Sequence, residues 1–370
     1  MSLYYVFLIF VPVIMEWAYE REIHKNPLPR VIAVATLLIL MTFRQGVGVD
    51  LPTYYRFYQN VDVLPVGTMD LGYTAFNWIF KRLGLNFNVF LFFSSVWMLY
   101  GFYSFLDRYV KQNKYIAALI YFGLFDMFVY SLSALRQALA ISAIFLAIIR
   151  FDSKKYVSSA LLLILAVSFH WSVFLLLPFF AVVRMCRKVK LWVLMAAVAV
   201  FPALYEQAMS SSLMQSLSSL HDHVFYYTQI VGSMNGNALQ CCVWILITEI
   251  WIFFIAGNER RRGKRHWFFT AQKYEAGYIS MSAIDWFIVF FLILKCCLAL
   301  KYNGALPRLF MFFYFFLPFG AVNQLRLRLN GRWMAVVFVF LLIILTLDFH
   351  NNLVLFEFAY GHPALTVYAH

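Results

Sequence analysis

The apolar run YIAALIYFGLFDMFVYSLSALRQALAISAIFLAII, residues 115–149, decides how this chain folds. Basic residues flank it on both sides, because Lys114 precedes it and Arg150 and Lys154 follow it. Basic loops of membrane proteins stay on the cytoplasmic side. Both ends of the run therefore lie inside, and the run crosses the membrane an even number of times. The pattern predicts a helical hairpin whose tip lies outside, near Arg136.

The next apolar run, residues 156–184, has the same charge pattern. It extends from the same basic residues to Arg184 and Arg187, and His170 marks the middle. We predict a second hairpin with its tip outside. Each leg has about 14 residues and a length of about 21 Å, which is short enough for this pair to be partly re-entrant rather than fully spanning.

The composition extends this interpretation to the whole chain. Its 370 residues are 63% hydrophobic and 13% charged, with a mean hydropathy of +0.75, whereas soluble domains are about 25% charged. This excludes a sizeable soluble domain and predicts an all-α polytopic membrane protein with about 12 transmembrane helices of about 20 residues each. The apolar segments are 3–19, 29–43, 87–106, 115–131, 133–149, 156–169, 171–184, 190–206, 238–257, 281–300, 305–321 and 333–348.

The distribution of basic residues supports this topology. Twelve crossings with both termini outside assign 22 of the 30 Lys and Arg residues to the inner side and 7 to the outer side, with Lys295 inside a span. The net charge of +13 is thus explained by orientation, and the RRRGKR cluster at 260–265 is interpreted as a stop-transfer anchor near anionic lipid rather than a nucleic-acid site. We expect residues 1–370 to form a single integral membrane domain, with larger outer segments at 44–86 and 207–237.

Segment 69–85 is predicted to be a short helix lying along the outer interface. Helical spacing places five of its residues on one face, and Lys81 and Arg82 are expected to reach water or lipid headgroups. The five are Leu71, Ala75, Trp78, Ile79 and Arg82.

A few cationic or titratable groups stand on the outer side, where the positive-inside rule disfavours cations. They are Arg44, Arg136, His170 and Arg308, and each lies at a different hairpin tip. The planar fork of arginine suits phosphate or carboxylate, and an uncompensated cluster of arginines is costly beside a membrane. An anionic partner is therefore expected, and a lipid-linked pyrophosphate fits. The alternative for any single arginine is a side chain that pairs with outer lipid headgroups.

Asp50 and His170 are the candidate groups for proton transfer. A base must reach the attacking hydroxyl, and histidine, with an ordinary pKa of about 6.5, suits this without tuning. The alternatives are that His170 is an interfacial or capping residue and that Asp50 caps a short helix over 53–60. Tyr54 lies four residues after Asp50, where it belongs either to an aromatic belt or to a sugar-stacking surface.

Other kinds of site find little support. The chain has no phosphate-binding glycine loop, and its five cysteines show no spacing typical of a disulfide framework or a zinc site. No cofactor and no metal are expected. Buried carboxylates at Asp126, Glu249 and Asp285 would suit the proton relay of a transporter, although structural pairing is the default interpretation.

The order of several short motifs resembles one known family. They are Arg44-x3-Gly48-x-Asp50-x3-Tyr54, Leu135-Arg136-Gln137-x-Leu139-Ala140, Phe169-His170-Trp171-Ser172 and Pro307-Arg308. Together, from about residue 40 to 320, they resemble Wzy-type bacterial polysaccharide polymerases of the EpsG-like branch. This resemblance implies a metal-independent glycosyltransferase with a GT-C-like fold in the bacterial inner membrane, with its active site facing the periplasm.

The resemblance also implies a substrate and residue roles. Such an enzyme polymerises undecaprenyl-diphosphate-linked oligosaccharide repeat units into O-antigen, capsule or exopolysaccharide, and a chain-length regulator is an expected partner. Arg136 and Arg308 would hold the donor diphosphate with Gln137 and Tyr54 beside them, Arg44 would bind acceptor or diphosphate, and His170 or Asp50 would remove the proton. Family members often carry an acidic residue, commonly glutamate, at the position of Asp70, and the shorter aspartate here puts a catalytic use in question.

Two other classes of function remain open at this point. The first is a transporter or flippase of lipid-linked sugars, which would place its charged site at mid-membrane and usually shows repeats. No repeat is visible in this chain. The second is another outer-face transferase, such as an O-antigen ligase or an acyltransferase. The order of the motifs favours the polymerase over the ligase.

Overall fold

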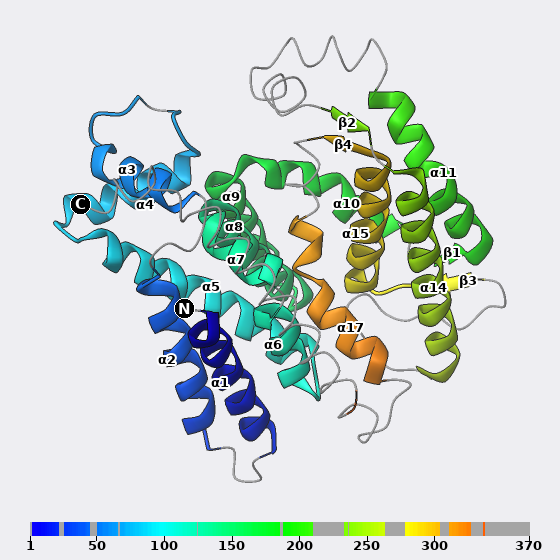
Figure 1. Cartoon of the computed structure of the whole chain (residues 1–370), viewed down its shortest axis with the longest axis horizontal. Coiled ribbons are helices and arrows are strands. Elements are labelled where there is room, and N and C mark those ends of the chain that lie inside the picture. Colours follow the sequence, from blue (N-terminus) through cyan, green and yellow to red (C-terminus); the bar gives the residue numbers. More distant parts are fainter. Residues whose placement is uncertain are drawn as a thin grey trace. The chain divides into compact units, whose positions relative to one another are not determined.

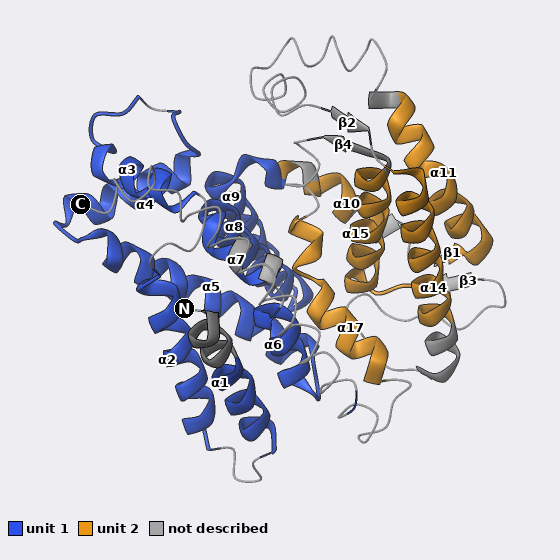
Figure 2. Cartoon of the chain, viewed as in Figure 1, with its two compact units in different colours: residues 1–173, 329–370 blue, residues 174–328 orange. Residues whose placement is uncertain are grey.

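The computed structural model describes residues 2–21, 26–44, 50–65, 67–123, 125–185, 188–209, 233–235, 237–262, 278–303, 311–326 and 336. The chain divides into two compact units (Figure 2), one made of residues 1–173 and 329–370 and the other of residues 174–328. Arg308, most of the outer segment 207–237 and the side chain of Asp126 lie outside the described residues.

The elements described in the first unit are all helical, as predicted. They are α1 (Ser2–Arg21), α2 (Leu28–Thr42), α3 (Leu51–Asn60), α4 (Leu71–Arg82), α5 (Phe87–Tyr109), α6 (Lys114–Gly123), α7 (Phe125–Ser133), α8 (Leu135–Asp152), α9 (Tyr156–Phe169) and the start of a 3-10 helix, η1 (Trp171–Leu176).

The core of this unit forms where α5 and α8 meet. The α8 helix packs between α5 and α9 (Figure 1), and Phe105 of α5 lies 4.6 Å from Phe145 of α8, measured between ring centroids. A Cβ atom at Gly101 would lie 2.8 Å from the Cβ of Ser142 and 2.9 Å from its Cα. Gly101 therefore lets the two helices approach closely enough for their phenylalanines to interdigitate.

The run 115–149 folds as the predicted hairpin. It leaves one end of the unit at Lys114, whose ammonium lies 2.5 Å from Asp107. It returns to that end at Asp152, which pairs with Arg108 at 3.0 Å. Its outgoing leg consists of two helices, α6 and α7, rather than one, and α6 ends at Gly123, a residue type that disfavours helix continuation.

A network of ion pairs, here called the inner network, closes the end of the unit that is predicted to lie inside. Its members are Glu16, Arg30, Asp107 and Lys114. The guanidinium of Arg30 pairs with Glu16, whose side chain is fully buried, and with Asp107 at 2.7 Å. The ring of Tyr19 also lies 4.2 Å from this guanidinium. The inner network joins α1, α2, α5 and α6 with its charges balanced.

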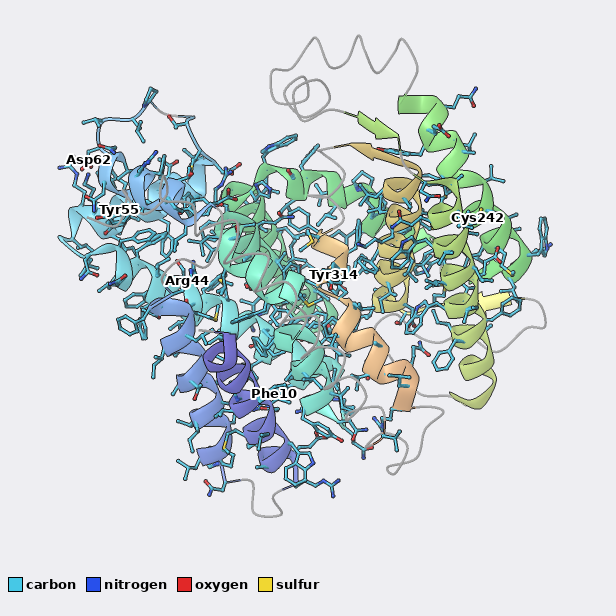
Figure 3. The ribbon with its side chains drawn as sticks, viewed as in Figure 1. Phe10, Arg44, Tyr55, Asp62, Cys242 and Tyr314 are labelled. Atoms are coloured by element: carbon cyan, nitrogen blue, oxygen red, sulfur yellow. The ribbon has the colours of Figure 1, made fainter. Side chains whose placement is uncertain are left out.

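The α4 helix has the amphipathic character predicted for segment 69–85. All five residues assigned to one face are exposed, whereas Tyr73, Asn77 and Phe80 are buried. Lys81 and Arg82 also pair with Asp62, at 3.2 and 3.6 Å. Figure 3 labels Asp62 and Tyr55 in this part of the unit.

The second unit adds further helices and two small sheets. Its elements are the rest of η1, α10 (Leu177–Met185), β1 (Lys188–Lys190), α11 (Leu191–Met209), β2 (Ser233–Asn235), α14 (Ala238–Arg262), β3 (Tyr278–Ser280), α15 (Ala283–Leu300), β4 (Lys301–Asn303) and α17 (Leu317–Arg326). The pairs β1–β3 and β2–β4 are antiparallel. The all-α prediction missed these strands, since three residues are too few to show the two-residue period of a strand.

Asp285 in this unit has a structural role. Its carboxylate accepts hydrogen bonds from the hydroxyl of Ser282 at 2.6 Å and from the side-chain amide of Gln324 at 2.5 Å. The backbone N–H of Asp285 in turn donates to the Ser282 hydroxyl. This is a capping box at the start of α15 that also ties α15 to α17, which confirms structural pairing as the default for this carboxylate.

Two of the described helices are long and apolar enough to cross a membrane, namely α5 and residues 238–256 of α14. The α14 helix exposes many large apolar side chains: Leu239, Val243, Leu246, Ile247, Ile250 and Phe253. A contiguous apolar surface of this kind is unfavourable in water and favourable against lipid.

Candidate functional site

Asp70 contacts residues from two segments that are distant from it in the sequence. Its Oδ2 atom lies 2.5 Å from Nη1 of Arg136 and 3.4 Å from Nδ1 of His170. Its Oδ1 atom accepts a hydrogen bond from the backbone N–H of Trp171 at 3.0 Å. The side chains of Asp70 and His170 are both almost fully buried. We call Asp70, Arg136 and His170 the outer triad, since they lie at the end of the unit that is predicted to face outward.

Helix ends position the outer triad. Asp70 directly precedes α4, Arg136 is the second residue of α8, and His170 directly follows α9. The backbone N–H of His170 donates to the carbonyl of Ala166 and closes α9. His170 is thus a capping residue through its backbone, while its side chain turns to Asp70. The capping alternative and the site role are therefore compatible.

Gly72 determines how closely α4 approaches α9. A Cβ atom at this position would lie 2.8 Å from the Cβ of Ser168 and 2.9 Å from its carbonyl carbon, and it would also overlap the Ser168 hydroxyl. Any side chain at Gly72 would therefore push apart the two helices that carry Asp70 and His170. The glycine is a steric requirement of the site rather than a source of flexibility.

We expect Gly72→Ala to disturb the site while leaving the rest of the fold intact. Overpacking of this kind typically costs about 1–3 kcal/mol, so the thermal midpoint of the purified protein should fall and the outer triad should lose its geometry. Ala75→Val, on the exposed face of the same helix, should change neither stability nor activity. Equal stability of Gly72→Ala and the natural protein would contradict this steric role.

The charges of the outer triad favour an ionised carboxylate. Burial raises the pKa of Asp70, but the hydrogen bond with His170 and the positive charge of Arg136 lower it by more, so its pKa lies below the ordinary value. Asp70 is therefore an anion at neutral pH and a poor proton acceptor. It can hold the Nδ1–H of His170, which leaves Nε2 as the basic nitrogen of the ring.

Tyrosines surround Arg136. Tyr54 of α3 forms a side-chain hydrogen bond with Arg136, and its ring centroid lies 5.5 Å from that of Tyr73. Both tyrosines are buried, so Tyr54 is part of the packed site. The neighbouring residue Tyr55, in contrast, is exposed.

Arg44 lies beside these tyrosines in an unusual environment. It follows α2 (Figure 3) and is 4% exposed. Its Nη1 donates to the carbonyl of Met41 at 3.1 Å, whereas Nε and Nη2 are buried with no hydrogen-bond partner in the described part of the chain. Burial lowers the pKa of Arg44 to about 10, and its charge interacts with Tyr73 and Tyr54. Arg44 is thus a buried cation at neutral pH.

The remaining residues singled out from the sequence lie as follows. Asp50 is exposed at the start of α3, its side chain makes no capping hydrogen bond, and its backbone N–H faces the Ser133 hydroxyl at 3.4 Å. The alternative interpretation, in which the Asp50 side chain caps this helix, is therefore wrong. Gln137 is buried next to Arg136 on α8.

Among the described residues, no group of three His, Cys, Asp or Glu side chains could hold a metal ion. The carboxylates of Asp62 and Asp70 pair with basic side chains. Asp62 pairs with Lys81 and Arg82, and Asp70 pairs with Arg136.

Asp70 is the residue that sequence reasoning passed over. Its partners are 66 and 100 residues away along the chain, so spacing gives no sign of the contact. The signal available was an acidic residue directly before an amphipathic helix and two positions before Gly72, at a position where the resemblance expects an acid. Aspartate is shorter than the glutamate common in the family, but Gly72 lets α4 and α9 approach closely and Asp70 reaches both partners.

A comparison with known proteins identifies the family of the chain. The model of the EpsG family matches residues 28–364, which cover nearly the whole chain and include all of the outer triad. The chain belongs to the EpsG family. No curated protein and no solved structure matches it. Membership of the EpsG family, together with the apolar helices, indicates a membrane protein with a polysaccharide-polymerase-like function.

Proposed function

We propose that this EpsG family member polymerises lipid-linked oligosaccharide repeat units at the outer face of the bacterial inner membrane. The growing glycan would leave one undecaprenyl diphosphate and join the terminal sugar of the next lipid-linked unit. The observation that carries this proposal is the outer triad, in which one carboxylate holds a cation and an imidazole together. A glycosyl transfer from a diphosphate needs both, a cation for the leaving group and a base for the attacking hydroxyl.

The reaction follows from these groups. Nε2 of His170 takes the proton of the acceptor hydroxyl as that oxygen attacks the anomeric carbon. The bond between the anomeric carbon and the phosphate oxygen breaks, and the diphosphate leaves with the bonding electrons. Asp70 keeps the Nδ1–H of His170 in place and stabilises the imidazolium that forms, as the buried carboxylate does in hydrolytic triads. Arg136 meets the negative charge that develops on the leaving diphosphate.

Other residues complete the proposal. Arg44 and Arg308 supply further positive charge for the diphosphate, and Gln137 and Tyr54 support Arg136. Asp50 is the alternative base, at the exposed edge of the site. No metal takes part in this scheme, because arginine side chains neutralise the charge of the leaving diphosphate.

The membrane arrangement is also part of the proposal. We infer about twelve crossings in a GT-C-like arrangement, with the outer triad on the periplasmic side. In support, Arg30, Arg108 and Lys114, which the charge distribution assigns to the inner side, meet at the end of the unit where α5 finishes. Arg136 and Asp70 instead meet where α8 begins.

The test is the glycan banding pattern of a host strain in which the gene is deleted and then restored. Glycan chains of different repeat number form a ladder of bands on a gel. In the deletion strain this ladder should collapse to a single-repeat band, and the intact gene should restore it. An unchanged ladder would reject the polymerase, and it would favour a transporter or flippase of lipid-linked sugars. Loss of all polymer from the lipid core, with polymer still made on undecaprenyl diphosphate, would indicate a ligase instead.

Arg136→Lys is expected to fail in the same complementation assay. The guanidinium can hold Asp70 with one N–H group while it offers others to a phosphate, whereas the single ammonium of lysine cannot span both. We expect the number of repeat units per glycan chain to fall to one or two, although the variant protein is present in the membrane in normal amount. Arg56→Lys, at an exposed position of α3, serves as the matched control and should give a normal ladder. A normal ladder from Arg136→Lys would rule out the proposed role of the fork.

A further inference from the structure

The most unusual group of the described chain outside the outer triad is the guanidinium of Arg44. It is almost fully buried, and two of its N–H-bearing nitrogens have no hydrogen-bond partner in the part of the chain that the structure describes. A buried arginine is normally paired with a carboxylate, because a lone charge removed from water is strongly unfavourable. The groups that interact with its charge are the tyrosines Tyr54 and Tyr73, which are neutral at physiological pH.

Arg136 presents the opposite case. Its Nη1 lies against Asp70, so its charge is compensated within the protein before any ligand arrives. Of the two arginines, the partly exposed Arg136 and the buried Arg44, Arg44 therefore gains more from the arrival of an anion. The anion would supply the missing hydrogen-bond acceptors and the missing negative charge at the same time.

The surroundings of Arg44 indicate what kind of anion fits. The hydroxyl of Thr42, two residues before Arg44, is also buried without a hydrogen-bond partner in the described structure. A hydroxyl donor and the N–H groups of a guanidinium fork suit the several oxygens of a phosphate group. The tyrosine rings beside Arg44 keep water away and strengthen this attraction.

We propose that Arg44 and Thr42 form a ready-built site for one phosphate group, and that this site, rather than Arg136, first captures the lipid-linked diphosphate. This proposal rests on the proposed function for the identity of the lipid. The capture step itself needs no glycan and no catalysis. Arg136 then acts only when charge develops on the leaving group, and it keeps its ion pair with Asp70 as it does so.

Binding to the purified full-length protein in detergent tests the proposal. Inorganic pyrophosphate and farnesyl diphosphate are the probes, and farnesol and galacturonate are the controls for lipid without phosphate and for carboxylate. We expect a rise in thermal midpoint and a saturable calorimetric signal with the phosphate-bearing probes. A response to both probes supports a site that recognises the phosphate group alone. A response to farnesyl diphosphate but not to pyrophosphate supports a site that also needs the lipid chain. A response to galacturonate with none to either phosphate probe overturns the proposal.

Arg44→Met separates ligand binding from folding. Methionine fills a similar volume without a charge, and replacing a buried uncompensated charge by an apolar side chain is neutral or stabilising. We expect the ligand-free midpoint of this variant to equal or exceed that of the natural protein, while affinity for the phosphate probes falls about tenfold to hundredfold. Arg82→Met, where an exposed arginine pairs with Asp62, is the matched control and should bind as the natural protein does.

The outcomes for capture and for polymerisation are distinguishable. Unchanged phosphate affinity in Arg44→Met overturns the capture site, whatever the ladder shows. A lower ligand-free midpoint with no phosphate response in the natural protein also overturns it, because Arg44 would then be a structural residue. Phosphate binding that depends on Arg44 in a protein without polymerase activity would support the capture site and overturn only the polymerase.

Discussion

Replacing Asp70 by asparagine should abolish polymer formation while the protein remains folded in the membrane. Asparagine has the same shape, so the packing against α9 is kept, but it carries no charge. It can no longer hold both Arg136 and the Nδ1–H of His170, and the imidazole loses the tautomer that a base requires. In hydrolytic triads the equivalent change lowers the rate by roughly 10⁴-fold. We expect a loss of similar order here, seen as collapse of the ladder to single repeats.

The control for this experiment is Asp62→Asn. Asp62 pairs with Lys81 and Arg82 at a partly exposed position, and such pairs contribute about 0–1 kcal/mol. Its ladder should be normal. Polymer of normal length from Asp70→Asn would show that the outer triad is only structural.

His170→Ala should also stop polymerisation, although the variant protein is present in the membrane in normal amount. General-base catalysis contributes about 10²- to 10⁴-fold, and no other imidazole in the described residues contacts Asp70. The backbone hydrogen bond from residue 170 to Ala166 does not depend on the side chain, so α9 should still end where it does. The variant should therefore be inserted and stable, yet inactive.

The pH dependence of transfer in membrane vesicles distinguishes a base from a packing residue. The rate of the natural protein should fall on the acid side as the base becomes protonated, and any residual rate of His170→Ala should lack this dependence. Trp171→Phe, at the exposed neighbour whose backbone N–H contacts Asp70, should keep the natural profile. Normal chain length from His170→Ala would return His170 to a capping role and leave Asp50 as the candidate base.

Local patterns in the sequence predicted much of the fold. Basic residues on both sides of 115–149 predicted the hairpin, because charge placement depends on the membrane rather than on tertiary contacts. The amphipathic face of α4 followed from helical spacing, which is likewise a local property. The short strand pairs were missed, because strands of three residues form through their partners and leave no periodic pattern.

The site was predictable only in part for the same reason. The charge pattern predicted that Arg136 and His170 lie at the same end of the helices, but their link through Asp70 depends on how α4, α8 and α9 pack. The same holds for Arg44: its position after α2 was evident, whereas its burial without a charged partner is a property of the packed site. Spacing along a chain shows which face or end a residue occupies, and contact across helices requires the fold.

The ion pair between Asp70 and Arg136 has a consequence for biosynthesis. The ribosome makes Asp70 well before Arg136, so in the proposed topology the carboxylate is already on the outer side when the hairpin 115–149 is inserted. A cation that must cross against the positive-inside rule is accepted more readily when a partner neutralises it. In the proposed topology, the carboxylate that later holds the imidazole would thus first help Arg136 to cross the bilayer, and it would favour one orientation of α8.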